Sequence, residues 1–166
     1  MEPGCCCGQS NICLSRTSCD GRIEGSGFTE KGMREDMEAI RISTDKCPKP
    51  GGWYSQAYRA GNLIFTAGVT ANDPVTQELV GPGDIVKQTE QVLKNMDILL
   101  REAGSDLKHV IKTLVFVSDI NDFSAFNETY KRFFPENPPA RSTMQIGRFN
   151  HGMVIEIEAV AVVPEG

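Results

Sequence analysis

The pattern of apolar and polar positions divides the chain near Lys46. Residues 1–46 mix Gly, Ser, Cys and charges of both signs without a sustained apolar period, so they offer little to bury in a core. From about residue 48 onward, short apolar runs alternate with clusters of Gly, Asn, Asp and Pro. We therefore expect a disordered or non-native leader over residues 1–46 and a single folded domain over residues 47–166.

The first part of this domain reads as three short strands, at residues 54–60, 63–69 and 78–80. Gly61-Asn62 separates the first two strands, and Asn72-Asp73-Pro74 follows the second, so each strand ends at residues that favour turns. Strands that follow one another so closely predict an antiparallel meander.

Two helices are expected next. Apolar or small residues recur every three or four positions between Asp84, a suitable N-cap, and Gly104, a suitable C-terminal stop. A β-branched strand at 110–117 follows this helix. Asp122 is then the expected cap of a second helix with a run of aromatic residues, which Pro135 stops.

Two final strands are predicted at residues 141–149 and 153–163, joined by a hairpin turn at 150–152. The order is thus β-β-β-α-β-α-β-β, an α+β arrangement in which two helices can cover only one face of the sheet. The strand at 153–163 is apolar on both faces. We therefore expect the uncovered sheet face to associate with other subunits.

Composition narrows the class of partner. The net charge of −5 and the pI of about 5.1 argue against nucleic acid, which is bound by clustered Lys and Arg. No apolar run reaches the roughly 18 to 20 residues of a membrane span, and the first residues lack a secretory signal, so we expect a cytoplasmic protein. All the cysteines except Cys47 fall within the first twenty residues, with spacings that suit neither a disulfide framework nor a zinc site.

The candidate chemistry centres on Arg141 and Glu156. Glu156 and Glu158 alternate with apolar residues on one strand, where a carboxylate is costly unless it is paired or functional. Arg141 follows Pro138-Pro139 on the strand predicted to be its neighbour, and its planar guanidinium suits a carboxylate ligand. An internal Arg–Glu salt bridge, or a surface pair, also explains these residues.

Other candidates carry weaker signals of their own. Tyr54 fits a plain edge strand, Asn127 fits a solvated or capping position in the second helix, and Thr143 shares a strand face with Arg141 by alternation. There is no convincing Ser-His-Asp or Cys-His arrangement, and no Gly-rich phosphate loop precedes a helix.

Several sequence blocks in a fixed order point to a known family. They are YSQAYRAGNLIFTAG (54–68), QTEQVLKNMDILLREAG (88–104), VIKTLVFVSDINDFSAFNETYKRFF (110–134), PPARSTMQIGRF (138–149) and EIEAVAVV (156–163). Through these blocks the segment 50–163 resembles the RidA/YjgF family of enamine and imine deaminases. The resemblance implies a chorismate-mutase-like α+β fold and a homotrimer with clefts between subunits.

The resemblance also implies a reaction: hydrolysis of 2-imino or enamine acids, of the 2-iminobutanoate and 2-iminopropanoate type, to 2-keto acids and ammonia without a metal or organic cofactor. In this family the residue matching Arg141 grips the substrate carboxylate, and the one matching Glu156 positions the attacking water. The matching substrate-binding positions are Tyr54, Ala67, Gly68, Asn127 and Thr143.

The chain departs from the usual family pattern at two of these places. It has Gly51-Gly52-Trp53-Tyr54 where members typically read I-G-P-Y, and Ala67 where many have Ser. Three other functions stay open: deamination of another enamine acid such as a 2-aminomuconate-like compound, endoribonuclease or translation-inhibitor activity, and metabolite binding by a trimer without catalysis.

Overall fold

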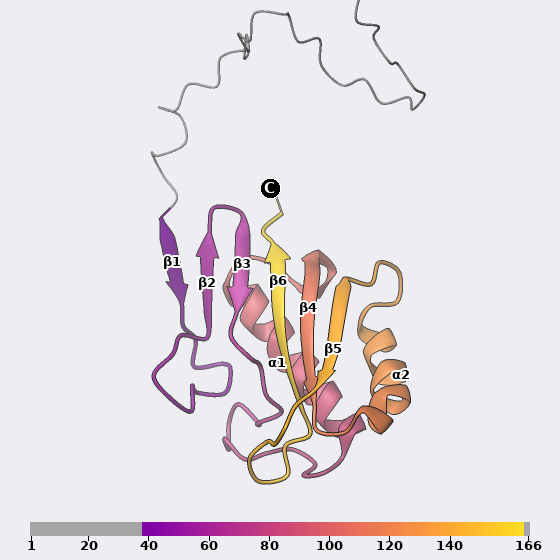
Figure 1. Cartoon of the computed structure of the whole chain (residues 1–166). Coiled ribbons are helices and arrows are strands. Elements are labelled where there is room, and N and C mark those ends of the chain that lie inside the picture. Colours follow the sequence, from indigo (N-terminus) through magenta and orange to yellow (C-terminus); the bar gives the residue numbers. More distant parts are fainter. Residues whose placement is uncertain (1–37, 165–166) are drawn as a thin grey trace, which may run out of the picture. The chain divides into compact units, whose positions relative to one another are not determined.

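A computed structural model describes residues 38–164, which form a six-stranded sheet and two helices (Figure 1). The strands are β1 (Ala39–Ile42), β2 (Ala57–Ala60), β3 (Leu63–Thr66), β4 (Val110–Val117), β5 (Ala140–Gln145) and β6 (Ile155–Val162). The helices are α1 (Ile85–Glu102) and α2 (Phe123–Phe133), with short 3₁₀ turns at Leu107–His109 and Ile120–Asp122. The strand order is β1-β2-β3-β6-β4-β5, and only the β4–β5 pair is parallel.

The domain begins earlier than the sequence predicted. β1 pairs with β2, and the Thr44 N–H after it donates a 2.8 Å hydrogen bond to the Gln56 side chain. The boundary predicted after Lys46 is therefore wrong, while residues 1–37 of the leader predicted over residues 1–46 lie outside the described residues. The strand predicted at 78–80 is also wrong, because Leu79 makes only an isolated bridge. β1 takes its place in the predicted β-β-β-α-β-α-β-β order.

The predicted N-cap and C-terminal stop of α1 are confirmed, whereas the predicted N-cap of α2 makes no capping bond with its side chain. Asp84 caps α1 as predicted, because its side chain accepts hydrogen bonds from the backbone N–H groups of Val86 and Lys87. Gly104 follows the end of the helix with a φ of +88°. Asp122 precedes α2 but makes no capping bond with its side chain. Asp119 does so instead, one turn earlier, at the start of the 3₁₀ turn.

The predicted final hairpin is wrong. β5 returns through α2 to lie parallel to β4, and β6 lies between β3 and β4. Residues 150–152 do form a turn, closed by a hydrogen bond from Met153 N–H to the Asn150 carbonyl, but the strands it joins are not neighbours. A strand that is apolar on both faces suits the centre of a sheet, whereas the more polar β5 suits its edge.

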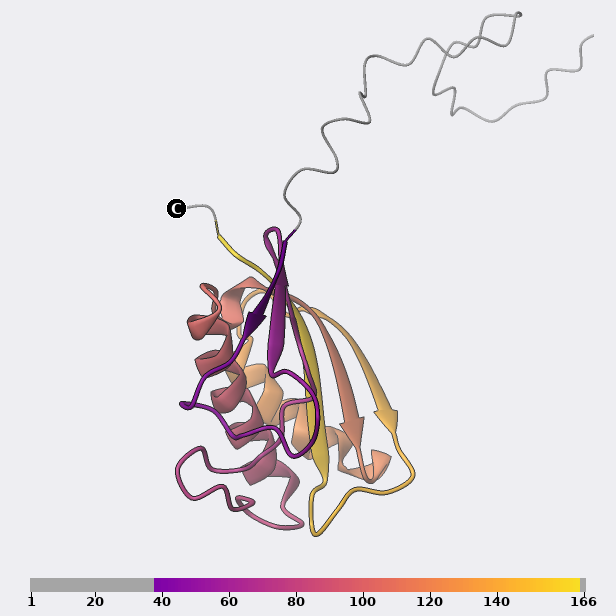
Figure 2. The same ribbon diagram turned by 90° about the vertical axis from the view of Figure 1, so that its left-hand side faces the viewer.

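Both helices lie on one face of the sheet (Figures 1 and 2), as predicted, and the core fills the space between them. Ile155 and Ile157 of β6 are fully buried there, against residues such as Leu93 and Met96 of α1. The opposite face carries large side chains that are 42–45% exposed, namely Tyr58, Phe65 and Met144. Neither helix within 38–164 is long and apolar enough to cross a lipid bilayer.

Candidate functional site

The Arg141 side chain lies under α2 in a partly buried position on the edge strand β5. One guanidinium nitrogen donates a 2.8 Å hydrogen bond to the Asn127 side-chain oxygen. The guanidinium carbon lies 4.7 Å from the ring centroid of Tyr130, 4.9 Å from that of Phe126 and 5.4 Å from that of Phe123. Three aromatic rings and one amide therefore hold the cation in a fixed position.

The Arg141 cation has no carboxylate partner within the part of the chain that the structure describes, because none of the ion pairs within 4.0 Å there involves Arg141. The internal Arg–Glu salt bridge considered from the sequence is therefore wrong. Instead, Arg141 lines a hollow of about 420 Å³ together with Asn127, Tyr130 and the two prolines Pro138 and Pro139. A guanidinium held in this way is available to an anionic ligand.

Thr143 belongs to the same side of β5. Arg141 lies opposite Thr113 of β4 and Thr143 lies opposite Val115, both of them buried residues of the helix-covered face. The hydroxyl oxygen of Thr143 is buried without a hydrogen-bond partner. Since buried polar atoms normally have partners, this hydroxyl is an unsatisfied group on the same strand face as Arg141. We call Arg141, Asn127 and Thr143 the arginine half-site.

Glu156 lies against the backbone of Gly68. A Cβ placed on Gly68 would be 2.0 Å from a carboxylate oxygen of Glu156, so only glycine permits this approach. The approach comes from a bulge after β3: three residues between Phe65 and Val69 oppose two residues of β6. The Thr66 hydroxyl stabilises the bulge by accepting a 2.9 Å hydrogen bond from Ala159 N–H.

Burial sets the acidity of Glu156. Desolvation raises the pKa of this carboxyl group above its usual range, and the nearby charge of Glu158 raises it further. A carboxyl group with a raised pKa exchanges protons more readily near neutral pH than an ordinary glutamate. Glu156 is therefore suited to accept a proton from water and to return it.

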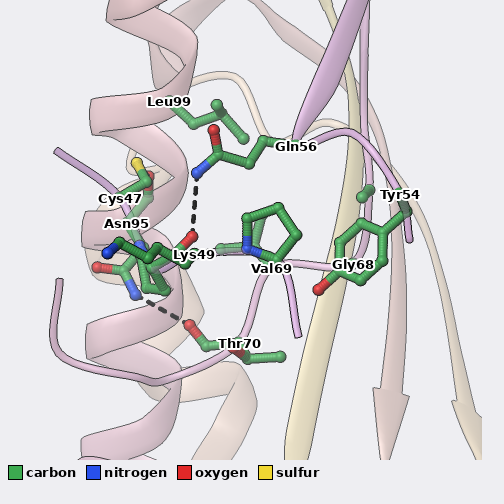
Figure 3. Close-up of a pocket in the computed structure, with 12 residues that line it drawn as sticks. Cys47, Lys49, Tyr54, Gln56, Gly68, Val69, Thr70, Asn95 and Leu99 are labelled. Carbon is green, nitrogen blue, oxygen red and sulfur yellow. Dashed lines mark hydrogen bonds between the residues drawn. The ribbon is translucent and has the colours of Figure 1, made fainter. Parts of the chain in front are cut away.

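Tyr54 and Ala67 lie beside Gly68, around a cavity of about 40 Å³ (Figure 3). Figure 3 shows Tyr54 and Gly68 on one side of this cavity and Asn95 of α1 on the other. Buried Gln56 fixes the surrounding loop, donating a 3.0 Å hydrogen bond to the Pro48 carbonyl and accepting one from Thr44 N–H. We call Tyr54, Ala67, Gly68 and Glu156 the glutamate half-site.

The two half-sites do not meet within one chain. β4 lies between β5 and β6, and Thr113 of β4 is opposite Arg141 on one side and Ala159 on the other. Arg141 and Ala159 therefore share a face of the sheet, whereas Glu156, an odd number of positions from Ala159 on β6, is on the other face. The side chains of Arg141 and Glu156 therefore leave opposite faces of the sheet, with Cα atoms separated by roughly 14 Å by strand geometry. The sequence prediction that these two residues lie on adjacent strands was wrong. Of the predicted site residues, Glu156 and Gly68 do lie in contact.

The sequence singled out Asn127 but not the aromatic residues that position Arg141. Phe126 and Tyr130 read there only as apolar residues of the second helix. Their spacing with Phe123, at i, i+3 and i+7, does mark one helix face. Nothing in that spacing shows that the face packs on an arginine from a strand 10 to 20 residues later, because the contact depends on the parallel return of β5.

Comparison with known proteins identifies the family. The family model described as Endoribonuclease L-PSP matches residues 44–163. A 2-iminobutanoate/2-iminopropanoate deaminase from Homo sapiens is 44% identical over 121 residues, which cover 73% of this chain and 88% of that protein. The structure of RidA from the Antarctic bacterium Psychrobacter covers 74% of this chain and 98% of its own, at 36% identity and a TM-score of 0.71.

A further solved structure, TdcF from E. coli with bound serine, shares 36% identity and a TM-score of 0.69, and the match covers 74% of this chain and 98% of that one. These matches extend over almost the whole described domain and nearly the full length of the relatives. The chain belongs to the RidA/YjgF family.

Proposed function

We propose that the protein hydrolyses reactive 2-imino or enamine acids, of the 2-iminobutanoate and 2-iminopropanoate type, to 2-keto acids and ammonia. The observation that carries this proposal is the Arg141 guanidinium, which is held by aromatic rings and Asn127 but has no carboxylate partner among the described residues. Such a group fits the carboxylate that every 2-imino acid carries. The name of the Homo sapiens relative supports the same substrate class.

The proposed active unit is a homotrimer with clefts between subunits. Because Arg141 and Glu156 leave opposite faces of the sheet, a cleft with both residues requires two chains. The uncovered face supplies apolar surface for such an assembly, since Phe65 and Met144 are exposed on it. In this arrangement the arginine half-site of one subunit faces the glutamate half-site of the next.

In the proposed reaction, Arg141 binds the substrate carboxylate and thereby fixes the position of the C=N carbon. Glu156 accepts a proton from water as the water oxygen bonds to that carbon, and the C=N π electrons move to nitrogen. Glu156 passes this proton to the nitrogen, which gives a carbinolamine with a hydroxyl and an amino group on the same carbon. Glu156 then moves the hydroxyl proton to the amino nitrogen, the C–N bond breaks with its electron pair leaving on ammonia, and the oxygen electrons form the carbonyl of the 2-keto acid.

One further group supplements this scheme. The buried Thr143 hydroxyl lies on the same strand face as Arg141 and can bond a second substrate atom. The imine carbon is already electrophilic, so the scheme needs no metal or organic cofactor. We expect the reaction to take place in the cytoplasm, which stays a prediction from the sequence.

An imine-trapping assay on the full-length protein tests the proposal. An amino acid oxidase produces 2-iminobutanoate in the presence of semicarbazide, and the deaminase lowers the yield of trapped product by hydrolysing the imine first. We expect activity in the wild type and its loss in the Arg141→Ala variant. Tight 2-keto acid binding without turnover would instead indicate a metabolite-binding trimer, and RNA cleavage that survives Arg141→Ala would indicate an endoribonuclease.

A further inference from the structure

Trp53 is the only tryptophan of the chain, and its large apolar side chain is fully exposed, at 106% of its reference area. It is part of a turn closed by two hydrogen bonds: Tyr54 N–H donates to the Gly52 carbonyl, and Gly51 N–H donates to the Tyr54 hydroxyl, each at 3.1 Å. These bonds fold the Tyr54 ring back onto the turn. The backbone that carries the indole is therefore fixed, while the indole itself contacts little of its own chain.

A hollow of about 550 Å³ lies beside this turn. Its lining includes three aromatic residues, Trp53, Tyr54 and Tyr58, and the basic residue Arg41. Tyr54 also lines the small cavity beside Gly68, whose backbone touches the Glu156 carboxylate. The aromatic hollow and the small cavity therefore share Tyr54, a residue of the glutamate half-site, as part of their lining.

We propose that Trp53, together with Tyr58, binds the substrate side chain and selects 2-imino acids with aromatic or large apolar side chains over those with a methyl or ethyl group. This inference rests on the proposed deaminase function and names its substrate class. A methyl group cannot reach across a hollow of this size, whereas an aromatic ring can bury itself against the indole face. A tryptophan offers this large contact area with only two rotatable bonds to order.

The proposal is tested by comparing two substrates on the full-length protein. An amino acid oxidase generates 2-imino-3-phenylpropanoate from phenylalanine and 2-iminopropanoate from alanine, and kcat/KM is obtained for each by semicarbazide competition. The variants are Trp53→Ala and the conservative Trp53→Phe. Val75→Ala is the matched control, because Val75 is 89% exposed and lines neither half-site nor the aromatic hollow.

We expect Trp53→Ala to lower kcat/KM for the phenyl substrate about tenfold, with less than a twofold change for the methyl substrate. Trp53→Phe should recover most of the loss, and Val75→Ala should match the wild type on both substrates. An equal effect on both substrates, or none on the phenyl substrate, overturns the proposal while leaving the deaminase function intact. A changed oligomer mass in Trp53→Ala would also overturn it, by showing that the indole packs between subunits. A wild type that hydrolyses neither imine overturns the proposed function and this inference with it.

Discussion

The side chains of Arg141 and Glu156 leave opposite faces of one β-sheet, separated by the intervening strand β4. Arg141 points toward the aromatic rings of α2, and Glu156 points to the uncovered face, against Gly68. A single chain therefore contains both parts of the proposed carboxylate-binding, water-activating site without joining them. Association of chains would have to complete the site, and the exposed apolar residues on the uncovered face supply a surface for it.

Replacement of Arg141 tests the carboxylate anchor. We expect Arg141→Ala to lower kcat/KM for 2-iminobutanoate by about 100-fold or more, because two charge-assisted hydrogen bonds to the substrate are lost. Arg141→Lys should recover only part of this activity, since an ammonium lacks the planar fork. Arg101→Ala serves as the control, because Arg101 is an exposed residue that pairs with Asp97 of the same helix. Equal activity in Arg141→Ala and Arg101→Ala would contradict the assignment.

Glu156→Gln should lower kcat by about 100-fold or more, since an amide cannot take a proton from water. In the wild type, kcat should fall as pH drops through the pKa of Glu156, which burial raises above the usual glutamate range. A profile that is flat through this range would count against Glu156 as the base.

The same raised pKa gives a prediction for stability. The folded chain holds the Glu156 proton more tightly than the unfolded chain, so the contribution of Glu156 to stability falls as pH rises from the ordinary glutamate pKa to the raised one. Glu156→Gln removes this loss. Its unfolding free energy relative to the wild type, measured by urea titration, should therefore be higher at pH 8 than at pH 4, and a difference of the opposite sign would show that the pKa is not raised.

Gly68→Ala tests whether activity depends on where the Glu156 carboxylate lies, because it moves this group without removing its charge. The new methyl group would displace the carboxylate, which is the end of a flexible side chain, so we expect about a tenfold loss of kcat/KM and little change in Tm. In a Glu156→Gln background the same change should cost almost nothing further. Additive losses in the double variant would mean that Gly68 acts independently of Glu156.

Cys47 should resist thiol reagents in the folded protein. Its side chain is 3% exposed, and burial raises the pKa of its thiol to about 11, so little thiolate forms at pH 8. After brief iodoacetamide treatment, peptide mass analysis should find Cys47 unmodified in the native chain and alkylated in the chain unfolded by guanidinium. Rapid native alkylation would show that the loop around Gln56 opens readily.

The sequence predicted local elements better than their neighbours in the sheet. The apolar period and caps of α1 were sufficient because they are set by residues three or four positions apart. β1 was missed because its residues are mostly exposed and its short pattern resembles the leader before it. The order of helices and strands along the chain agrees with the prediction only because β1 replaces the strand predicted at 78–80, where Leu79 makes a single bridge.

For the site, too, the sequence predicted local features better than contacts between distant parts of the chain. The family resemblance supplied the residues of the proposed site, and the alternation of β6 correctly put Glu156 on the face away from the buried Ile155 and Ile157. The relation of Arg141 to Glu156 could not be read in this way, because it depends on β5 returning through α2 to the far side of β4. The tight approach of Glu156 to Gly68 depends on a bulge, which no local pattern announced.

Subunit complementation tests the composite cleft most directly. Arg141→Ala and Glu156→Gln chains, each inactive alone, are mixed in equal amounts, unfolded and refolded together. If every cleft takes Arg141 from one chain and Glu156 from another, random assembly leaves about a quarter of the clefts with both residues intact. We predict that the mixture regains about a quarter of the wild-type deaminase activity. A mixture that stays as inactive as its two parents, although mass analysis shows mixed oligomers, would contradict the account.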